Sequence, residues 1–209
     1  MTTRVKICGL TRLEDARRAV DLGAAALGFN FFPPSPRYIE PRAARAIIRR
    51  LPPFVTGVGV FANETDAGHV ISLAREAGVT TVQVHGPKFP ALDELYAAST
   101  LVVAVTVREG FRPEDLREVK ASAYLLDAFD PGLLGGTGKT FDWSAARDSK
   151  QYGPIILAGG LGPENVGRAV REVRPFAVDV ASGVESTPGI KDAAKLRAFF
   201  AAVAEADKE

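Results

Sequence analysis

The chain contains one cysteine, Cys8, which ends the first apolar run directly before Gly9, and a carboxylate, Asp127, which ends the sixth run. A thiolate can accept a proton and a carboxylic acid can donate one, if their surroundings shift the two pKa values in opposite directions. The structural alternative is that Cys8 is a small buried hydrophobe and that Asp127 accepts backbone hydrogen bonds from its own loop. The pair is therefore a candidate for proton transfer on a small substrate.

Three further polar residues are candidates for substrate binding. His85 and Asp179 also end apolar runs, and we expect His85 to join Gln83 in an inward polar network rather than to act directly on a substrate. Arg37 follows three prolines within five residues, so a stiff loop would hold its guanidinium ready for bidentate binding of a carboxylate. At this point an arginine exposed to solvent is an equal alternative.

Glycine-rich turns follow the sixth, seventh and eighth apolar runs. Glycine lets backbone N–H groups approach an anion, and a following helix N-terminus adds a favourable dipole. One such turn is better explained as a short connection, but three in succession favour a phosphate group. Residues 138–140 do not form a nucleotide-binding P-loop, because Leu133 stands where that motif needs glycine. The phosphate-binding candidates are Gly136, Gly138, Gly159, Gly160, Ser182 and Gly183.

The elements that must position these residues alternate along the whole chain. Runs typical of strands cover residues 4–8, 26–31, 54–61, 79–84, 101–107, 122–127, 154–158 and 176–181. Helical patterns follow at residues 12–22, 41–51, 64–77, 90–98, 113–119, 143–149, 163–173 and 191–204. Eight βα units in succession predict a parallel sheet with helical crossovers.

Side-chain alternation within the strands favours a closed barrel over an open doubly wound sheet. In the first strand Val5 and Ile7 share one face, whereas Lys6 and Cys8 share the other. An open sheet covered by helices on both sides needs two apolar faces, but here one face becomes polar toward the strand ends. We therefore predict an α/β fold that is a single (β/α)8 TIM barrel.

The barrel prediction also fixes the domain organisation and the place of the site. We expect residues 1–209 to form one domain, with residues 205–209 as a frayed polar tail. Active sites of this fold lie at the carboxyl ends of the strands. Cys8 and Asp127, which come from the first and sixth strands, should then face each other across the mouth of the barrel.

The composition excludes several other classes of protein. The formal net charge is +1, from 26 basic and 25 acidic side chains, so the sequence predicts no nucleic-acid partner and no binding to a membrane surface. One cysteine excludes an internal disulfide, and with two histidines it predicts no metal site. Because no signal peptide or membrane span is present, we expect a cytoplasmic protein. The sequence leaves both a monomer and a homodimer open.

The candidate residues lie in short motifs that together span nearly the whole chain. These motifs occupy residues 6–11, 35–38, 83–86, 126–127, 135–138, 141–143, 157–161, 179–185 and 188–189. In type and order they resemble those of the phosphoribosylanthranilate isomerase family, which acts in tryptophan biosynthesis. Each motif is weak alone, but the set is specific.

This resemblance implies an Amadori rearrangement of N-(5′-phosphoribosyl)anthranilate to 1-(2-carboxyphenylamino)-1-deoxyribulose 5-phosphate, without a cofactor. In the family, the residue matching Asp127 is the general acid that protonates the ribose ring oxygen and opens the ring to a Schiff base. The residue matching Cys8 is the general base that removes the C2′ proton. The residue matching Arg37 holds the anthranilate carboxylate, and the glycine turns bind the phosphate.

Three other functions compete with this one. The related phosphosugar isomerase of histidine biosynthesis shares the fold and the phosphate turns, but that family has an aspartate where this chain has Cys8, and a dual-specificity enzyme also stays open. Indole-glycerol-phosphate synthase needs catalytic lysines at strand ends, for which Lys6 alone is a poor match. A phosphosugar-binding barrel without catalysis would need neither Cys8 nor Asp127.

Overall fold

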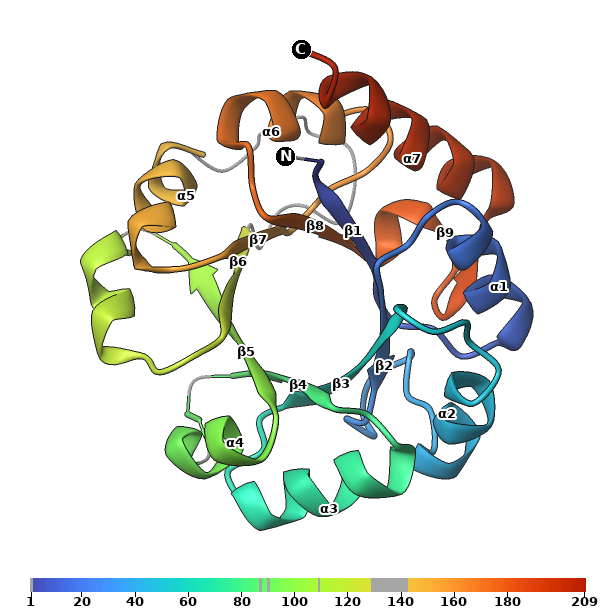
Figure 1. Ribbon diagram of the computed structural model, residues 1–209, viewed down its shortest axis with the longest axis vertical. Helices are drawn as coiled ribbons and strands as arrows, with labels where there is room; N and C mark the ends of the chain where they lie inside the picture. The colour runs from blue at the N-terminus through green and yellow to red at the C-terminus, as the bar shows by residue number, and fades with distance from the viewer. Residues whose placement is uncertain (1, 87, 90, 109, 129–142) are drawn as a thin grey trace.

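A computed structural model describes residues 2–86, 88–89, 91–108, 110–128 and 143–209. Parallel strands close into a barrel in chain order, and helices surround it (Figure 1). The prediction of a (β/α)8 barrel is therefore confirmed. The strands are β1 (Arg4–Ile7), β2 (Ala26–Asn30), β3 (Thr56–Ala62), β4 (Thr81–His85), β5 (Thr100–Val107), β6 (Ala123–Ala128), β7 (Ile155–Ala158) and β8 (Ala177–Val180).

The helices follow the strands as the sequence pattern predicts, with one change of type. They are α1 (Leu13–Asp21), α2 (Pro41–Ile48), α3 (Ala67–Ala77), α4 (Leu92–Ala98), α5 (Ser144–Ser149), α6 (Val166–Val173) and α7 (Ala193–Ala206). A short 3-10 turn, η2 (Lys150–Tyr152), extends α5. The α-helix expected at residues 113–119 is a 3-10 helix, η1 (Pro113–Glu118). Leu116 is the buried residue of that segment, so little apolar surface supports a longer α-helix.

Two apolar layers hold the barrel together. The outer layer lies between strands and helices, and includes Ile7, Phe29 and Leu126. The inner layer fills one side of the barrel with Leu125, Ile156 and other residues of β5 to β8. The alternation seen in the sequence is thus real, because neighbouring residues of β6 enter different layers.

The first and last strands close the barrel through a buried ion pair. Lys6 of β1 and Asp179 of β8 are partners in the strand register. The Lys6 ammonium donates a hydrogen bond of 2.9 Å to the Asp179 carboxylate, and the two side chains are only 5% and 9% exposed. Charges buried this deeply need such compensation.

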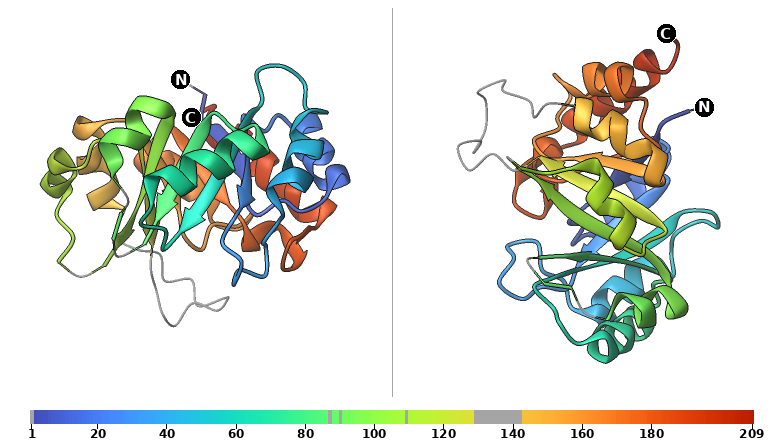
Figure 2. Two further views of the ribbon diagram at one scale, coloured as in Figure 1. Left: turned by 90° about the horizontal axis from the view of Figure 1, so that it is seen from below. Right: turned by 90° about the vertical axis from the view of Figure 1, so that its left-hand side faces the viewer.

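The last residues of the chain fold more tightly than their composition suggests. Helix α7 continues through Ala206, and the Asp207 carboxylate accepts hydrogen bonds of 2.8 and 2.7 Å from the backbone and hydroxyl of Thr3. The two ends of the chain therefore lie together on the side where the strands begin (Figure 2). The sequence predicts a frayed tail at residues 205–209, whereas the structure places residues 205 and 206 in α7 and bonds Asp207 to Thr3.

A small hairpin between β8 and α7 is a further element that the βα pattern does not predict. A 3-10 turn, η3 (Ser182–Val184), leads into β9 (Glu185–Thr187), which pairs with β10 (Ile190–Lys191). The intervening Gly189 has φ +81°, which follows from the Pro-Gly turn. In the described part of the chain, no helix is long and apolar enough to cross a membrane.

We expect the Lys6→Met variant to lose roughly 3–5 kcal/mol of unfolding free energy, because it leaves the buried Asp179 carboxylate without its partner. Urea denaturation followed by circular dichroism measures this loss. The control is Lys120→Met, which breaks an ion pair of 2.8 Å with Asp93 whose side chains are 56% and 83% exposed. That variant should unfold as the wild type does, and an equal loss in both variants would contradict the role of burial.

Candidate active site

A cavity of about 320 Å³ lies at the carboxyl ends of the strands. Most of the site residues expected from the sequence line it: Cys8, Arg37, His85, Asp127, Gly159, Gly160, Asp179 and Ser182. Gly183 lies next to Ser182 and packs against the turn after β7. Gly136 and Gly138 fall outside the described residues. The fold thus gathers side chains from six of its loops and strand ends at one mouth.

The Cys8 thiol occupies space that the neighbouring strand leaves open. Cys8 extends β1, since its backbone N–H donates a hydrogen bond of 2.9 Å to the carbonyl of Val180. On β2, a Cβ atom at Gly28 would lie 2.8 Å from the Cys8 sulfur and 3.2 Å from the Lys6 Nζ. The absence of a side chain at Gly28 therefore makes room for the thiol and the ammonium side by side.

Burial raises the pKa of the Cys8 thiol above its ordinary value. The charge of Lys6 opposes this shift, the charge of Asp179 adds to it, and that of Lys191 again opposes it. The attraction of Asp179 also keeps the pKa of Lys6 above its ordinary value, although burial alone would lower it. The free protein therefore holds a neutral thiol beside a protonated Lys6 at neutral pH.

Asp127 has a raised pKa for the same reason. Burial raises the pKa of its carboxyl, the charge of His85 lowers it, and that of Asp179 raises it further. This shift suits a group that must donate a proton. Both pKa values therefore move upward, whereas the sequence argument needed shifts in opposite directions. The shift thus favours the acid form of Asp127 and disfavours the thiolate of Cys8.

The loop that carries Arg37 is held by hydrogen bonds at its base. The Asn30 carboxamide accepts a bond of 2.9 Å from the N–H of Phe32 and donates one of 3.2 Å to the Ser35 hydroxyl. That hydroxyl in turn accepts a bond of 3.1 Å from the N–H of Arg37. The prolines and this network together restrict the conformations open to the loop.

The Arg37 side chain is 23% exposed and is paired with Glu185. Its Nε donates at 3.0 Å to one carboxylate oxygen of Glu185, and its Nη2 donates at 2.7 Å to the other. These bonds lower the pKa of Glu185 although its burial alone would raise it. Within the described residues, the Nη1 group of Arg37 has no acceptor. The guanidinium therefore keeps one edge for a further anion.

The turns after β7 and β8 lie against each other through Gly183. A Cβ atom there would come within 2.0 Å of the Leu161 carbonyl oxygen, so only glycine allows this approach. Gly159 and Gly160 have φ +84° and +60°. Among the described backbone hydrogen bonds, none uses the N–H groups of Gly160, Ser182 or Gly183. These donors are thus available to a phosphate, the group expected from the sequence.

Gln83 and His85 both line the cavity, on β4. Gln83 is only 6% exposed, and its Oε1 atom has no hydrogen-bond partner in the described part of the chain. The expected polar network is therefore not formed by a direct bond between these two side chains. An amide oxygen buried without a partner at a cavity wall can accept a hydrogen bond from a substrate hydroxyl.

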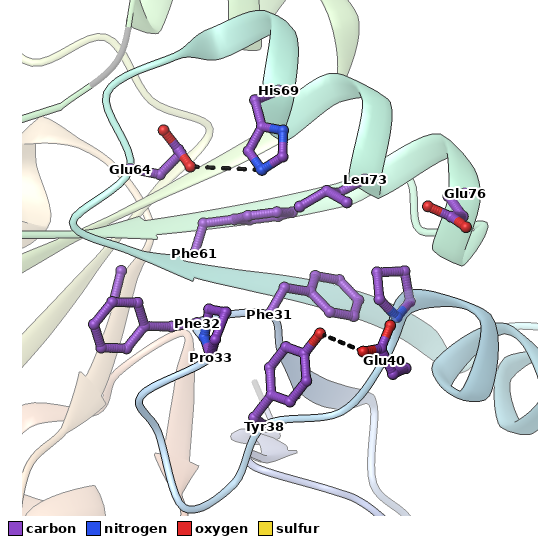
Figure 3. Close-up of a pocket in the computed structure, with 12 residues that line it drawn as sticks. Phe31, Phe32, Pro33, Tyr38, Glu40, Phe61, Glu64, His69, Leu73 and Glu76 are labelled. Atoms are coloured by element: carbon purple, nitrogen blue, oxygen red, sulfur yellow. Dashed lines mark hydrogen bonds and ion pairs between the residues drawn. The ribbon is translucent and has the colours of Figure 1, made fainter.

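A second cavity, of about 290 Å³, lies outside the barrel mouth between the loop after β2 and helix α3. Figure 3 shows its aromatic rings between two polar pairs. The Tyr38 hydroxyl donates to Glu40 at 3.0 Å, and His69 lies 3.8 Å from Glu64. Arg37 thus lines the mouth whereas the next residue, Tyr38, lines this outer cavity. Of the predicted site residues that the structure describes, none lines the outer cavity.

Sequence reasoning assigned no role to four residues at the mouth: Gly28, Asn30, Glu185 and Lys191. A glycine inside a strand is a signal of close approach, which could have identified Gly28. Charged residues on both sides of the Pro188-Gly189 turn could have predicted the hairpin but not its partners. The described residues contain no group of three or more histidine, cysteine or acidic side chains placed to hold a metal ion.

Comparison with known proteins gives the same picture over the full length of the fold. The relative from Citrifermentans bemidjiense, named N-(5′-phosphoribosyl)anthranilate isomerase, is 51% identical over 95% of this chain and 96% of its own length. A relative of the same name from Geobacter sp. strain M21 is 52% identical over 99% and 98%.

Solved structures of phosphoribosyl anthranilate isomerases superpose on this fold over nearly its full length. The phosphoribosyl anthranilate isomerase of Thermus thermophilus superposes with a TM-score of 0.87 at 43% identity, covering 97% of this chain and 99% of that one. A phosphoribosyl anthranilate isomerase in complex with reduced 1-(o-carboxyphenylamino)-1-deoxyribulose 5-phosphate gives a TM-score of 0.84 at 39% identity, covering 98% and 100%. The sequence model of N-(5′-phosphoribosyl)anthranilate isomerase matches residues 5–202, and the chain belongs to this family.

Proposed function

We propose that the protein catalyses the Amadori rearrangement of N-(5′-phosphoribosyl)anthranilate to 1-(2-carboxyphenylamino)-1-deoxyribulose 5-phosphate, a step of tryptophan biosynthesis. The observation that carries this proposal is the meeting of Cys8, Arg37 and Asp127 around one cavity at the barrel mouth. The three groups match the demands of the substrate, which needs a base, a partner for its carboxylate and an acid. Family membership supports the same reaction.

In the first step, Asp127 gives its proton to the ribose ring oxygen. The bond between this oxygen and C1′ breaks, and the nitrogen lone pair forms the Schiff base. The raised pKa of Asp127 supports this role, because it favours the protonated form of the carboxyl. The step leaves a carboxylate on the protein and a positive charge on the substrate.

In the second step, the Cys8 thiol loses its proton to the solvent, and the resulting thiolate removes the C2′ proton. The electrons of that C–H bond form an enolamine, which tautomerises to the ketone. Because burial raises the pKa of Cys8, its thiolate needs a further source of stabilisation. The cationic Schiff base supplies a positive charge in the same cavity. Lys6 and Lys191 add to its effect, since the charges of both lower the pKa of Cys8.

The remaining residues hold the substrate. Arg37 binds the anthranilate carboxylate with the edge of its guanidinium that Glu185 leaves open. The turns at Gly159–Gly160 and Ser182–Gly183 bind the phosphate with their backbone N–H groups. His85 and Asp179 face the sugar between these two ends. Because the substrate carries two anionic groups at opposite ends, both anchors fix its orientation.

The assembly and the location of the protein stay predictions. A relative from Thermotoga maritima is described as dimeric, and monomeric forms of it were generated. We retain both a monomer and a homodimer for this chain, which sedimentation velocity distinguishes. The expectations of a cytoplasmic location and of independence from nucleic acid rest on the sequence.

The reaction itself is tested by a fluorescence assay of N-(5′-phosphoribosyl)anthranilate consumption. We expect turnover by the wild type, and a loss of roughly 10²-fold or more in kcat for Cys8→Ala and for Asp127→Asn, because each removes a proton-transfer group. Asp93→Asn, an exposed aspartate of α4, is the control and should be fully active. Full activity in either site variant would refute the proposed roles. Turnover of the histidine-pathway aminoaldose in the same assay would indicate dual specificity.

Carboxylate binding is tested by Arg37→Ala. We expect KM to rise roughly 10- to 100-fold, the range for losing a charge-assisted pair, with a smaller change in kcat. The matched control is Arg42→Ala, whose side chain is 89% exposed on the neighbouring helix α2 and paired with Glu76. An unchanged KM in Arg37→Ala would show that this arginine does not bind the substrate carboxylate.

The ionisation of the base is open to direct measurement, because the chain contains one cysteine. We expect the thiolate absorbance of the free protein to develop above the ordinary pKa of a thiol, with no such signal in Cys8→Ser. Since the active form combines a thiolate with a protonated carboxyl, kcat/KM should rise with pH up to the pKa of Asp127, level off, and fall above that of Cys8. A thiolate already formed at neutral pH would contradict activation by the substrate.

A further inference from the structure

The pairing of Arg37 with Glu185 has a defined geometry. A guanidinium carries five N–H donors, two of which form a side-on edge (Nε and one hydrogen of Nη2) and two an end-on edge (Nη1 and the other hydrogen of Nη2). Glu185 occupies the side-on edge with bonds of 3.0 and 2.7 Å. The end-on edge, which can bind a second carboxylate in the same bidentate manner, is left open.

Glu185 is itself held from the other side by Lys191. The Lys191 ammonium, whose side chain is 0% exposed, donates at 2.8 Å to the Oε1 atom of Glu185. It also donates at 2.6 Å to the carbonyl of Cys8 and at 3.1 Å to that of Ala181. One buried cation thus fixes Glu185 relative to the strand end that carries the thiol.

The hairpin of β9 and β10 carries both Glu185 and Lys191 and restrains the Glu185 side chain. Its strands place Glu185 opposite Lys191 in register. The N–H of Gly189 at the turn donates to the Glu185 carboxylate at 3.2 Å, and the carbonyl of Gly189 accepts a bond of 2.7 Å from the Thr11 hydroxyl. The N–H of Lys191 donates at 3.1 Å to the buried Asp15. Few rotamers therefore remain open to Glu185.

The charges of the three residues leave a net positive charge for an anion. Arg37 and Lys191 contribute two positive charges and Glu185 one negative charge, so the group carries one net positive charge. A glutamate beside an anion-binding arginine weakens the attraction for that anion. Attraction for the anion therefore does not explain its presence. Glu185 instead compensates the buried charge of Lys191 and orients the guanidinium of Arg37.

We infer that Glu185, held by Lys191, is a positioning residue that fixes Arg37 so that the end-on edge of its guanidinium binds the substrate carboxylate. This inference rests on the proposed function, because the carboxylate is that of the anthranilate ring. Glu185 makes no contact with the reacting atoms in this scheme. It acts by removing the rotational freedom that Arg37 would otherwise lose on binding.

The Glu185→Gln variant distinguishes two effects of Glu185 on carboxylate binding, the orientation of Arg37 and the electrostatic repulsion of the carboxylate. The two effects predict opposite changes in affinity. The variant removes a negative charge, so attraction alone would tighten binding of a carboxylate. Positioning forecasts weaker binding, because an amide cannot accept two bonds from the side-on edge. The probes are reduced 1-(o-carboxyphenylamino)-1-deoxyribulose 5-phosphate and its counterpart without the carboxylate, titrated by fluorescence at fixed pH and salt.

We expect Glu185→Gln to weaken binding of the carboxylated probe by about tenfold, with the other probe unchanged. Glu185→Asp, which keeps the charge beside Lys191 but shortens the reach to Arg37, should show the same selective loss. In an Arg37→Ala background, Glu185→Gln should cause no further loss, because the effect passes through Arg37. Glu40→Gln, on the outer face of the same loop (Figure 3), is the matched control and should bind both probes as the wild type does.

Three outcomes would overturn the inference: equal or tighter binding of the carboxylated probe by both Glu185 variants, a parallel loss for both probes, or an additive loss in the Arg37→Ala background. A parallel loss would indicate a structural role, which circular dichroism melting would register as well. Failure of the proposed function is distinct from these, because the wild type itself would then neither bind the carboxylated probe nor consume N-(5′-phosphoribosyl)anthranilate.

Discussion

The arrangement of the site depends on how the barrel buries charge where its first and last strands meet. Lys6 and Asp179 are register partners there, and each is nearly inaccessible to water. A buried ammonium and a buried carboxylate tolerate little displacement, because each compensates the desolvation of the other. The pair therefore supports the register between β1 and β8. That register in turn sets the position of Cys8, which lies one residue beyond β1. The same ammonium is a source of positive charge beside the thiol.

The hairpin after β8 adds a second buried cation to the same junction. Lys191 reaches the carbonyl groups of Cys8 and Ala181, which follow β1 and β8 respectively. Its third bond, to Glu185, continues to Arg37 in the loop after β2. Three loops from distant parts of the chain are thus joined by alternating charges. This chain of bonds links the position of Cys8, the proposed base, to that of Arg37, the proposed carboxylate anchor. A substrate whose carboxylate is bound by Arg37 is thereby held in a fixed position relative to Cys8.

The sequence predicts the repeating part of this structure well, because periodicity is a local signal. Strand alternation assigns Leu125 and Leu126 to different layers, and the strand ends identify Cys8 and Asp127 as neighbours of one mouth. The pairing of Glu185 is different, since its arginine lies 148 residues earlier and the carbonyl bound by Lys191 lies 183 residues earlier. No local pattern encodes such a partner. The sequence therefore identifies the site residues as candidates. The network that orients them can be recognised only from the folded structure, because its partners lie far apart in the chain.

The ionisation of the two proposed catalytic groups follows from the same burial, and it constrains the order of the chemistry. Burial at the barrel mouth raises the pKa of a carboxyl and of a thiol alike, so one environment cannot prepare an acid and a base together. For Asp127 the raised pKa favours the protonated form, which an acid needs. Cys8 is hindered, and the nearby lysines offset only part of the effect. In the proposed mechanism, ring opening by Asp127 creates the cation that the thiolate needs, so acid catalysis comes first. In the proposed mechanism, the burial of Asp127 and Cys8 thus sets the order of the two proton transfers.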